Sequence, residues 1–370
     1  MLIRTALNPC VNPHLRTLTS LAQEGGRGLV LKSLSTDVYE NLALEDWIHD
    51  HVDLQSRTLL LLWKNTPAVV IGRHQNPWQE CNLRLMRDRG VALARRRSGG
   101  GTVYHDLGNI NMTFFTSRKK YDRVRNLRVV TSALQQLRPG LDVRATERFD
   151  ILLNGGYKIS GTAAKLGRVS AYHHCTLLCG SDRSLLSAVL RSSCQGIQSN
   201  ATPSVPSPVK NLQDEDPSLD CRAVMDAVAA EYSAQYGLDH RVSDIDPTDE
   251  ISLPGIRRMA QDLKTWEWVY GKTPKFSVRS GFEVRDGSSS SSAALRMGVR
   301  NGLIESCRVE LPADWLPAAL CDELAAQLIG GRFCPGETAV LTAAVLRTCP
   351  QGSEIRNKWN ILCDSVAAVM

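Results

Sequence analysis

Apolar residues recur along this chain at two spacings, which together predict a mixed α/β protein. Between residues 37 and 48 they follow helical periodicity, and either Thr36 or Asp37 can cap the start of that helix. Residues 57–63 and 68–71 are short, continuously apolar runs, which are typical of buried strands. Helical and strand-like patterns then alternate towards the end of the sequence.

The same patterns predict further elements between turn-forming residues. Further helices are predicted at 82–89, 121–137, 184–191, 223–236, 254–263, 322–329 and 359–369. Further strands are predicted at 91–94, 110–115, 149–153, 157–159, 171–178, 275–278 and 295–299. The dipeptide Asn154-Gly155 supplies the positive φ angles of a tight turn, so residues 149–159 are expected to form a hairpin.

Several polar stretches predict loops and a domain boundary. Residues 196–208 contain three prolines and predict a long surface loop, and the serine run at 287–292 predicts an exposed turn. The acidic stretch at 244–249 resembles a linker. We therefore expect a large α/β domain over residues 26–245 and a small α+β domain over residues 246–370.

Composition and charge narrow the class of protein. The chain has 370 residues, of which 43% are hydrophobic and 22% charged, as in an ordinary globular protein. Its longest apolar run falls short of the roughly 18 residues that cross a bilayer. The formal charge of +6 suits an acidic protein or a nucleotide phosphate. Basic residues do not form a dense stripe interleaved with aromatic ones, so nucleic acid is not the expected partner.

The N-terminal segment and the cysteines indicate a cellular compartment. Residues 1–23 contain Arg4, Arg16 and several hydroxyl residues but no acidic residue, which is typical of a mitochondrial transit peptide; a disordered tail is the alternative. We exclude residues 1–25 from fold prediction. The 11 cysteines are scattered without paired spacing, so we expect reduced thiols rather than disulfides or a metal site.

The segment at 95–109 is the strongest candidate for chemistry. Three arginines precede three contiguous glycines, Gly99 to Gly101. Glycines let the backbone approach a ligand, and arginines form charge-assisted hydrogen bonds with phosphate. The segment lacks the spacing of a Walker loop and of a dinucleotide fingerprint. It therefore predicts an anion- or nucleotide-binding loop, with a solvated surface turn as the alternative.

Two other segments carry reactive side chains. Lys158 lies on a predicted strand just before Ser160 and Gly161, which suits contact with a phosphate or carbonyl oxygen, although an exposed hairpin lysine would have the same pattern. His173 and His174 point to opposite faces of a strand, which disfavours a shared metal ion. Cys175 is expected to be a small packing residue rather than a nucleophile, because no general base stands at a fixed spacing from it.

These segments together resemble the lipoate–protein ligase family, and within it the animal mitochondrial lipoyltransferases. The resemblance rests on the ordered motifs at 69–82, 95–109, 158–163, 173–178, 209–212 and 265–268. It implies a biotin/lipoate-ligase-like α/β fold, a large mixed-sheet domain with a small C-terminal domain. One departure is Cys175, where the bacterial ligases of the family have glycine.

The resemblance also implies a substrate and the residues that bind it. The bound substrate would be lipoyl-AMP, with no permanent cofactor and with Mg²⁺ needed only if the enzyme activates lipoate. Lys158 is the expected catalytic residue, stabilising the developing oxyanion and the departing phosphate. The expected binding residues are Arg97, Ser98, Gly99, Gly100, Gly101, Thr102, Val103, Tyr104, Asn109, Arg148, Asp150, Lys158, Ser160, Gly161, Ala163, Thr176, Val205 and Ser207.

The expected activity is transfer of a lipoyl group from lipoyl-AMP, or from a lipoylated donor protein, to a lysine of an acceptor. The family's acceptors are lipoyl domains of 2-oxoacid dehydrogenase acyltransferase subunits and the glycine cleavage H protein. The alternatives are a full ligase that also activates free lipoate with ATP, and a non-catalytic lipoate carrier. We expect a monomer in the mitochondrial matrix that binds neither nucleic acid nor membrane.

Overall fold

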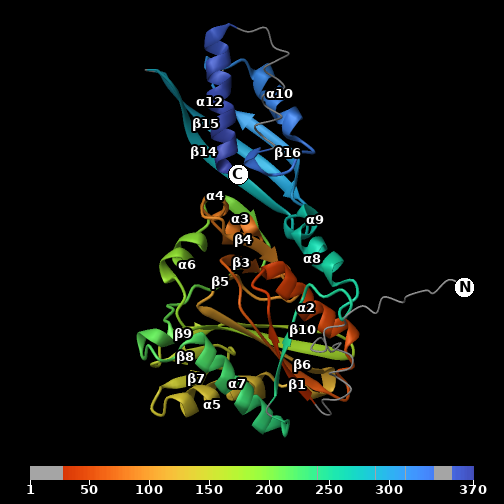
Figure 1. Ribbon diagram of the computed structural model, residues 1–370. Helices are drawn as coiled ribbons and strands as arrows, with labels where there is room; N and C mark the ends of the chain where they lie inside the picture. The colour runs from red at the N-terminus through yellow and green to blue at the C-terminus, as the bar shows by residue number, and fades with distance from the viewer. Residues whose placement is uncertain (1–27, 240, 288, 313, 337–351) are drawn as a thin grey trace, which may run out of the picture. The chain divides into compact units, whose positions relative to one another are not determined.

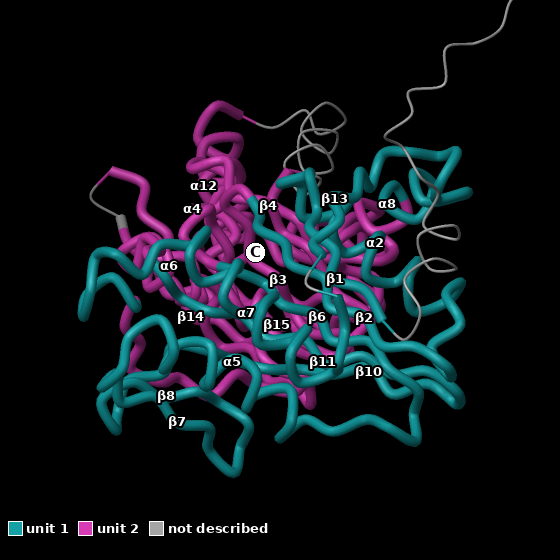
Figure 2. The backbone as a smooth tube through the Cα atoms, turned by 60° about the horizontal axis from the view of Figure 1, so that its bottom comes forward, with its two compact units in different colours: residues 1–65, 110–179, 212–261 teal, residues 66–109, 180–211, 262–370 magenta. Residues whose placement is uncertain are grey.

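The computed structural model describes residues 28–239, 241–287, 289–312, 314–336 and 352–370. The predicted transit peptide at 1–25 lies outside these residues. The chain forms two compact units, each assembled from three separate stretches (Figure 2). Unit 1 comprises residues 1–65, 110–179 and 212–261, and unit 2 comprises residues 66–109, 180–211 and 262–370.

Unit 1 contains a six-stranded mixed sheet and a three-stranded hairpin sheet. The large sheet has the order β10-β11-β6-β2-β1-β13, and the small one β7-β8-β9. The strands are β1 (Gly28–Ser33), β2 (Thr58–Trp63), β6 (Asn109–Ser117), β7 (Val143–Ala145), β8 (Ile151–Leu153), β9 (Tyr157–Ser160), β10 (Thr162–Leu166), β11 (Ser170–Leu178) and β13 (Val242–Ile245). The helices are α2 (Val38–His51), η1 (Arg118–Lys120), α5 (Arg123–Leu137), η2 (Leu212–Asp214), α7 (Cys221–Tyr236) and α8 (Ile256–Lys264), which ends in unit 2.

Helices cover both faces of the large sheet in unit 1 (Figure 1). Helices α5 and α7 pack side by side, and their apolar residues join those of β2, β6 and β11 in one core. Helix α2 contacts the opposite face of β11. Asp37 caps α2 by accepting from two backbone N–H groups, as its sequence predicts. The alternating directions of side chains along β11 therefore determine which residues reach the core.

Unit 2 contains a three-stranded sheet, β4-β3-β5, and a four-stranded sheet, β12-β14-β15-β16. The strands are β3 (Ala68–Ile71), β4 (Ala92–Arg95), β5 (Val103–His105), β12 (Ile197–Ser199), β14 (Phe276–Asp286), β15 (Ser289–Arg300) and β16 (Leu303–Glu310). The helices are α3 (Pro77–Glu80), α4 (Leu83–Asp88), α6 (Arg183–Val189), α9 (Trp266–Val269), α10 (Ala318–Leu328) and α12 (Ser353–Val369). Trp78 is buried among Tyr270, Phe276 and Phe333, so α3 shares a core with the four-stranded sheet.

Most predicted elements are confirmed, including the hairpin at Asn154-Gly155, whose φ angles are 49° and 70°. Two predictions were wrong. The predicted linker begins inside β13, which pairs in parallel with β1. The serine run lies mostly in β15, where it pairs with β14 across a long hairpin. The loop at 196–208 is present over residues 200–208, but its first part forms the short strand β12. In each case backbone pairing stabilises a polar segment that lacks the apolar signal of a buried strand.

The predicted boundary near residue 245 falls within unit 1, which continues to Gln261. Unit 2 also takes in residues 66–109 and 180–211, so the compact units alternate along the chain. The division into a catalytic and a C-terminal domain stays a prediction. Among the described helices, none combines the length and the apolarity needed to span a lipid bilayer.

Candidate active site

The residues predicted to bind the substrate fall on both units. The glycine loop, Asn109, Val205 and Ser207 belong to unit 2, whereas Arg148, Asp150, Lys158, Ser160, Gly161, Ala163 and Thr176 belong to unit 1. Each group has a geometry of its own.

In unit 2, Arg95 is fully buried at the end of β4 and acts as a structural residue. Its guanidinium donates to three backbone carbonyls of residues 72–75, to the Val269 carbonyl and to Thr273 Oγ1. Burial lowers its pKa to about 10, so the group still carries a charge at neutral pH. Its hydrogen-bonding capacity is therefore directed at the protein backbone rather than at a ligand.

Arg96 shapes the glycine loop from inside. It donates to the carbonyls of Gly99 and Gly101, both at 2.6 Å, to Ser98 Oγ at 3.0 Å and to Val70 O at 3.0 Å. Because Arg96 donates hydrogen bonds to these carbonyls, the loop can keep its tight curvature. Of the three arginines, Arg95 and Arg96 thus support the loop.

Arg97 has a different environment. It is half-buried, and its guanidinium carbon lies 5.4 Å from the centre of the Trp268 ring. The Trp268 indole in turn donates to the carbonyl of Arg95 at 2.7 Å. The α9 tryptophan thereby orients the one arginine of the three that has part of its surface accessible. The role of Arg97 in ligand binding stays a prediction.

The glycines permit a close backbone approach. A Cβ atom on Gly72 would lie 2.1 Å from the carbonyl oxygen of Gly100, and Gly100 itself has a φ angle of 85°. Gly99 is half-buried and Gly100 exposed. Any larger residue at position 72 would displace the loop, and the positive φ angle of Gly100 favours glycine there as well.

A buried carboxylate that the sequence did not reveal joins this loop to the segment at 199–208. Glu80 is 8% exposed, and its Oε2 accepts from the Ser204 hydroxyl and lies 3.0 Å from Thr102 Oγ1. The backbone N–H of Thr102 donates to Ser204 Oγ at 2.9 Å, and Gln75 Nε2 donates to the same oxygen at 3.1 Å. We call Gln75, Glu80, Thr102 and Ser204 the loop latch. Gln75, Glu80 and Thr102 stand in the motifs at 69–82 and 95–109, but nothing in their spacing predicts that they meet Ser204.

The other predicted residues of unit 2 differ in accessibility. Ser98, Tyr104 and Asn109 are buried, whereas Val205 and Ser207 are exposed beyond the loop latch. Burial and the neighbouring Asp106 raise the pKa of Tyr104, so its phenol stays protonated. Thr102 and Val103 are half-buried.

In unit 1, Lys158 extends from β9 and pairs with Asp150 across 2.9 Å. A Cβ atom on Gly161 would lie 3.6 Å from Lys158 Nζ and 3.9 Å from Thr176 Oγ1. The N–H of Gly161 donates to Thr176 Oγ1 at 3.2 Å, so lysine, glycine and threonine are neighbours. Both members of the ion pair keep about a quarter of their side-chain surface, with exposed fractions of 26% and 22%. The predicted grouping of Lys158, Asp150, Gly161 and Thr176 is thus present within this unit.

The turn before Asp150 has an unusual backbone. Phe149 has a φ angle of 64°, in the left-handed region that non-glycine residues rarely adopt. The Arg123 guanidinium lies 4.6 Å from its ring centre, which favours this placement of the side chain. Arg148 is exposed. Backbone strain beside an ion-paired lysine is a feature that concentrates at functional sites.

The side chains of β11 divide between two faces. Thr176 and His174 share the half-buried face, while Cys175 is buried in the core that contains α5 and α7. Burial raises the pKa of the Cys175 thiol to about 12, so the thiol stays protonated. Both observations support the expectation that Cys175 is a packing residue. Ser160 and Ala163 are also buried.

His174 and Glu45 form a buried pair that the sequence did not predict. His174 Nδ1 lies 2.8 Å from Glu45 Oε1, and Thr113 Oγ1 donates to the same oxygen at 2.7 Å. Burial acts to raise the pKa of Glu45, but the interactions with His174 and Thr113 outweigh it and hold the pKa below its ordinary value. His173, on the other face, is buried and its pKa is lowered by burial, so it is neutral.

Each unit of this α/β protein therefore offers groups suited to binding an anion. A stabilised glycine loop offers backbone groups and Arg97, and a paired lysine offers a positive charge beside a hydroxyl. Residues 37–233 match the family model described as the lipoyl protein ligase A/B catalytic domain. The chain belongs to this family.

The similarity extends beyond the catalytic domain. The chain is 57% identical to the mitochondrial lipoyl amidotransferase of Homo sapiens over 343 residues, 93% of this chain and 92% of that protein. Among solved structures, a Plasmodium falciparum protein in complex with lipoate matches with a TM-score of 0.58, 25% identity and coverage of 92% and 99% of the two chains. A lipoate–protein ligase A bound with ATP matches with a TM-score of 0.53 at 27% identity, covering 66% and 98%.

Proposed function

We propose that this enzyme transfers the lipoyl group of lipoyl-AMP to the ε-amino group of a lysine on an acceptor protein. The observation that carries the proposal is the Lys158 ammonium, which Asp150 holds against Gly161 beside the Thr176 hydroxyl. In a chain of the lipoyl protein ligase family, such a charge is suited to an acyl-phosphate substrate.

The reaction follows from the chemistry of a mixed anhydride. The acceptor amine attacks the acyl carbonyl, an oxyanion develops, and the C–O bond to the phosphate breaks with its electron pair leaving on AMP. The amine loses one proton as the amide forms. Lys158 stabilises the negative charge on the carbonyl and phosphate oxygens, an electrostatic contribution of about 3–4 kcal/mol by analogy with an oxyanion-hole donor. The enzyme therefore needs neither a nucleophilic cysteine nor a covalent intermediate.

The remaining binding residues divide the substrate between them. In our proposal Arg97 and the backbone of residues 98–104, with Asn109, line the lipoyl tail and the adenylate. Arg148 and Asp150 lie near the nucleotide, and Ser160, Gly161, Ala163 and Thr176 contact the acyl phosphate. Val205 and Ser207 contact the adenylate through their backbone, which agrees with the exposure of their side chains.

The proposed acceptors are lipoyl domains of 2-oxoacid dehydrogenase acyltransferase subunits and the glycine cleavage H protein. The formal charge of +6 suits acidic acceptors. The name of the human relative supports a mitochondrial location, which we refine to the matrix, where a monomer would act. An alternative donor is a lipoyl group carried by another protein.

A second candidate activity is full ligation, in which lipoate and ATP first form lipoyl-AMP with Mg²⁺. The similarity to a ligase bound with ATP favours this alternative. Ligation requires the same adenylate-binding residues as transfer. The two activities therefore differ only in the substrates they consume and the products they release.

A transfer assay separates these activities. Purified enzyme is mixed with an apo lipoyl domain and supplied with lipoyl-AMP, with a lipoylated H protein, or with lipoate, ATP and Mg²⁺. We expect lipoylated product with lipoyl-AMP and no pyrophosphate with lipoate and ATP. Pyrophosphate release would establish the ligase instead, and failure with every donor would contradict the proposed function. An acceptor whose lysine is replaced by arginine serves as the control.

A further inference from the structure

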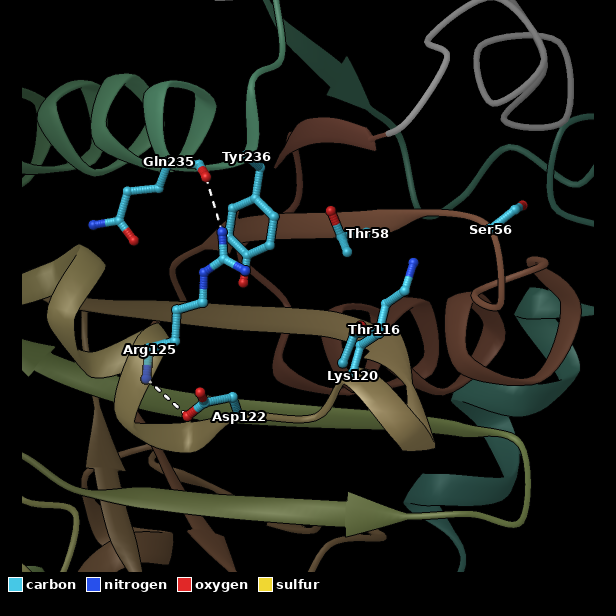
Figure 3. Close-up of a pocket in the computed structure, with 8 residues that line it drawn as sticks. All are labelled: Ser56, Thr58, Thr116, Lys120, Asp122, Arg125, Gln235 and Tyr236. Carbon is cyan, nitrogen blue, oxygen red and sulfur yellow. Dashed lines mark hydrogen bonds between the residues drawn. The ribbon is translucent and has the colours of Figure 1, made fainter.

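Unit 1 carries a cavity of about 600 Å³ that is lined by none of the residues given a role above. Figure 3 shows its walls, which come from the start of β2, the end of β6, η1, the first turn of α5 and the last turn of α7. The lining residues are Ser56, Thr58, Thr116, Lys120, Asp122, Arg125, Gln235 and Tyr236. A volume of this size lies within the range of pockets that bind small molecules.

The sequence around the cavity is strongly basic. Residues 118–128 contain six arginines and lysines and one acidic residue, Asp122. The Asp122 carboxylate accepts from the backbone N–H of Arg125 at 3.0 Å and caps α5, so part of its charge is used in the protein. The local excess of positive charge favours an anionic ligand.

Arg125 is held in place before any ligand binds. Its Nη2 donates to the Gln235 carbonyl at 2.8 Å, and its guanidinium carbon lies 4.0 Å from the centre of the Tyr236 ring. Figure 3 shows the guanidinium lying across that ring, and Arg125 is one of the residues that line the cavity. An oriented guanidinium loses little conformational entropy on binding, which favours affinity.

Lys120 stands in the same wall of the cavity. It is exposed, and its ammonium extends between Thr58 and Ser56 in the view of Figure 3. Thr116 is 8% exposed, and its hydroxyl oxygen is closed to solvent, so this residue contributes to the wall rather than to ligand contacts.

From these observations we propose that the cavity binds a small molecule through a phosphate group. A tetrahedral phosphate presents enough oxygens to accept from the Lys120 ammonium and from several N–H groups of Arg125 together, whereas a carboxylate has two oxygens. The cavity is larger than a phosphate alone, so it has room for the rest of the molecule. This site is independent of the proposed transfer reaction.

The direct test is titration of the full-length enzyme with inorganic phosphate at constant ionic strength, followed by calorimetry. Lys120→Ala removes one proposed contact, and we expect it to weaken binding about tenfold or more. Lys119→Ala is the matched control, because it removes the same charge from the adjacent exposed position, which does not line the cavity. We expect it to change the affinity by less than about twofold, since exposed charges are screened.

Other outcomes would overturn the proposal. Equal weakening by Lys119→Ala and Lys120→Ala would show diffuse charge attraction, and acetate binding as tightly as phosphate would contradict the choice of ligand. No binding to the wild-type enzyme would remove the site. A raised KM for the acceptor protein in Lys120→Ala, without phosphate binding, would assign this face to an acidic protein. Thermal unfolding establishes that each variant folds, as expected for two exposed lysines.

Discussion

The glycine loop of unit 2 and the Lys158 hairpin of unit 1 both place cations beside glycine, but the cations act differently. Arg95 and Arg96 are buried and donate to backbone carbonyls, so they hold the loop in shape. Lys158 is about a quarter exposed and forms an ion pair with the Asp150 carboxylate. A phosphate group can compete with that carboxylate for the ammonium. The charges of Arg95 and Arg96 thus stabilise the glycine loop, whereas the charge of Lys158 stays accessible to a ligand.

This difference teaches that a cation beside glycines is not by itself a ligand-binding residue. A guanidinium has five N–H donors, enough to satisfy several carbonyls of a curved loop. An ammonium is a compact charge that can change partners. We therefore expect the number of hydrogen bonds to backbone carbonyls to distinguish structural from functional cations in this protein.

The largest effect on stability is expected for Arg95→Met. The substitution leaves several buried carbonyls without a donor, so we predict a loss of more than about 3 kcal/mol in the free energy of unfolding. Denaturant titration measures it, and Arg97→Met is the matched control, expected to cost less than about 1 kcal/mol. Equal losses in the two variants would break the distinction between structural and functional arginines.

The loop latch should affect binding more than chemistry. Ser204→Ala removes the hydroxyl that joins Glu80 to Thr102, and we predict that KM for lipoyl-AMP rises about tenfold with little change in kcat. Ser193→Ala, an exposed position of unit 2 outside the latch, should leave both constants unchanged. A fall in kcat at constant KM for Ser204→Ala would instead give the latch a role in the transition state.

Cys175→Ala tests the buried face of β11 against the face that carries Thr176. The thiol lies in the apolar core, so its removal should cost about 1 kcal/mol of stability and leave the rate of transfer unchanged. Thermal unfolding and the transfer assay measure the two quantities. A variant that folds normally but transfers nothing would mean that the thiol is catalytic.

The smallest effect concerns the pH dependence of stability at Glu45. Its pKa in the folded protein is held below the ordinary value of 4.5, so the ionised carboxylate stabilises the fold above about pH 4.5. That stability is lost as the pH falls through the lower folded-state pKa. Unfolding measured from pH 7 to pH 3 should therefore show wild type and Glu45→Gln converging at low pH. A constant difference across this range would contradict the assignment.

The sequence predicted the elements with strong periodicity better than those that depend on partners. The helix at Val38–His51 and the strand at Thr58–Trp63 carry their own apolar patterns and caps. The strands β12 and β13 are short and polar, and they exist because β14 and β1 offer backbone groups for pairing. These strands form because of tertiary contacts, which a local sequence pattern does not reveal.

The site was predicted unevenly for a related reason. Lys158 and Arg97 stand in recognisable motifs, and the structure gives both an accessible environment. Glu80 and Ser204 are 124 residues apart in the chain, and Glu45 and His174 are 129 apart. Such pairs become visible only when the fold brings them together, because nothing in the sequence links two positions so far apart.

The central claim is that Lys158 stabilises the transition state of transfer rather than supporting the fold. Single-turnover transfer from lipoyl-AMP to an apo lipoyl domain, measured for Lys158→Ala and for Lys165→Ala, tests it most directly. Lys165 is the matched control, since it is also ion-paired in unit 1, to Asp46 and Asp50. We predict that Lys158→Ala slows the chemical step about 10²–10³-fold with its unfolding temperature nearly unchanged, while Lys165→Ala transfers normally. An unchanged rate in Lys158→Ala would contradict the account.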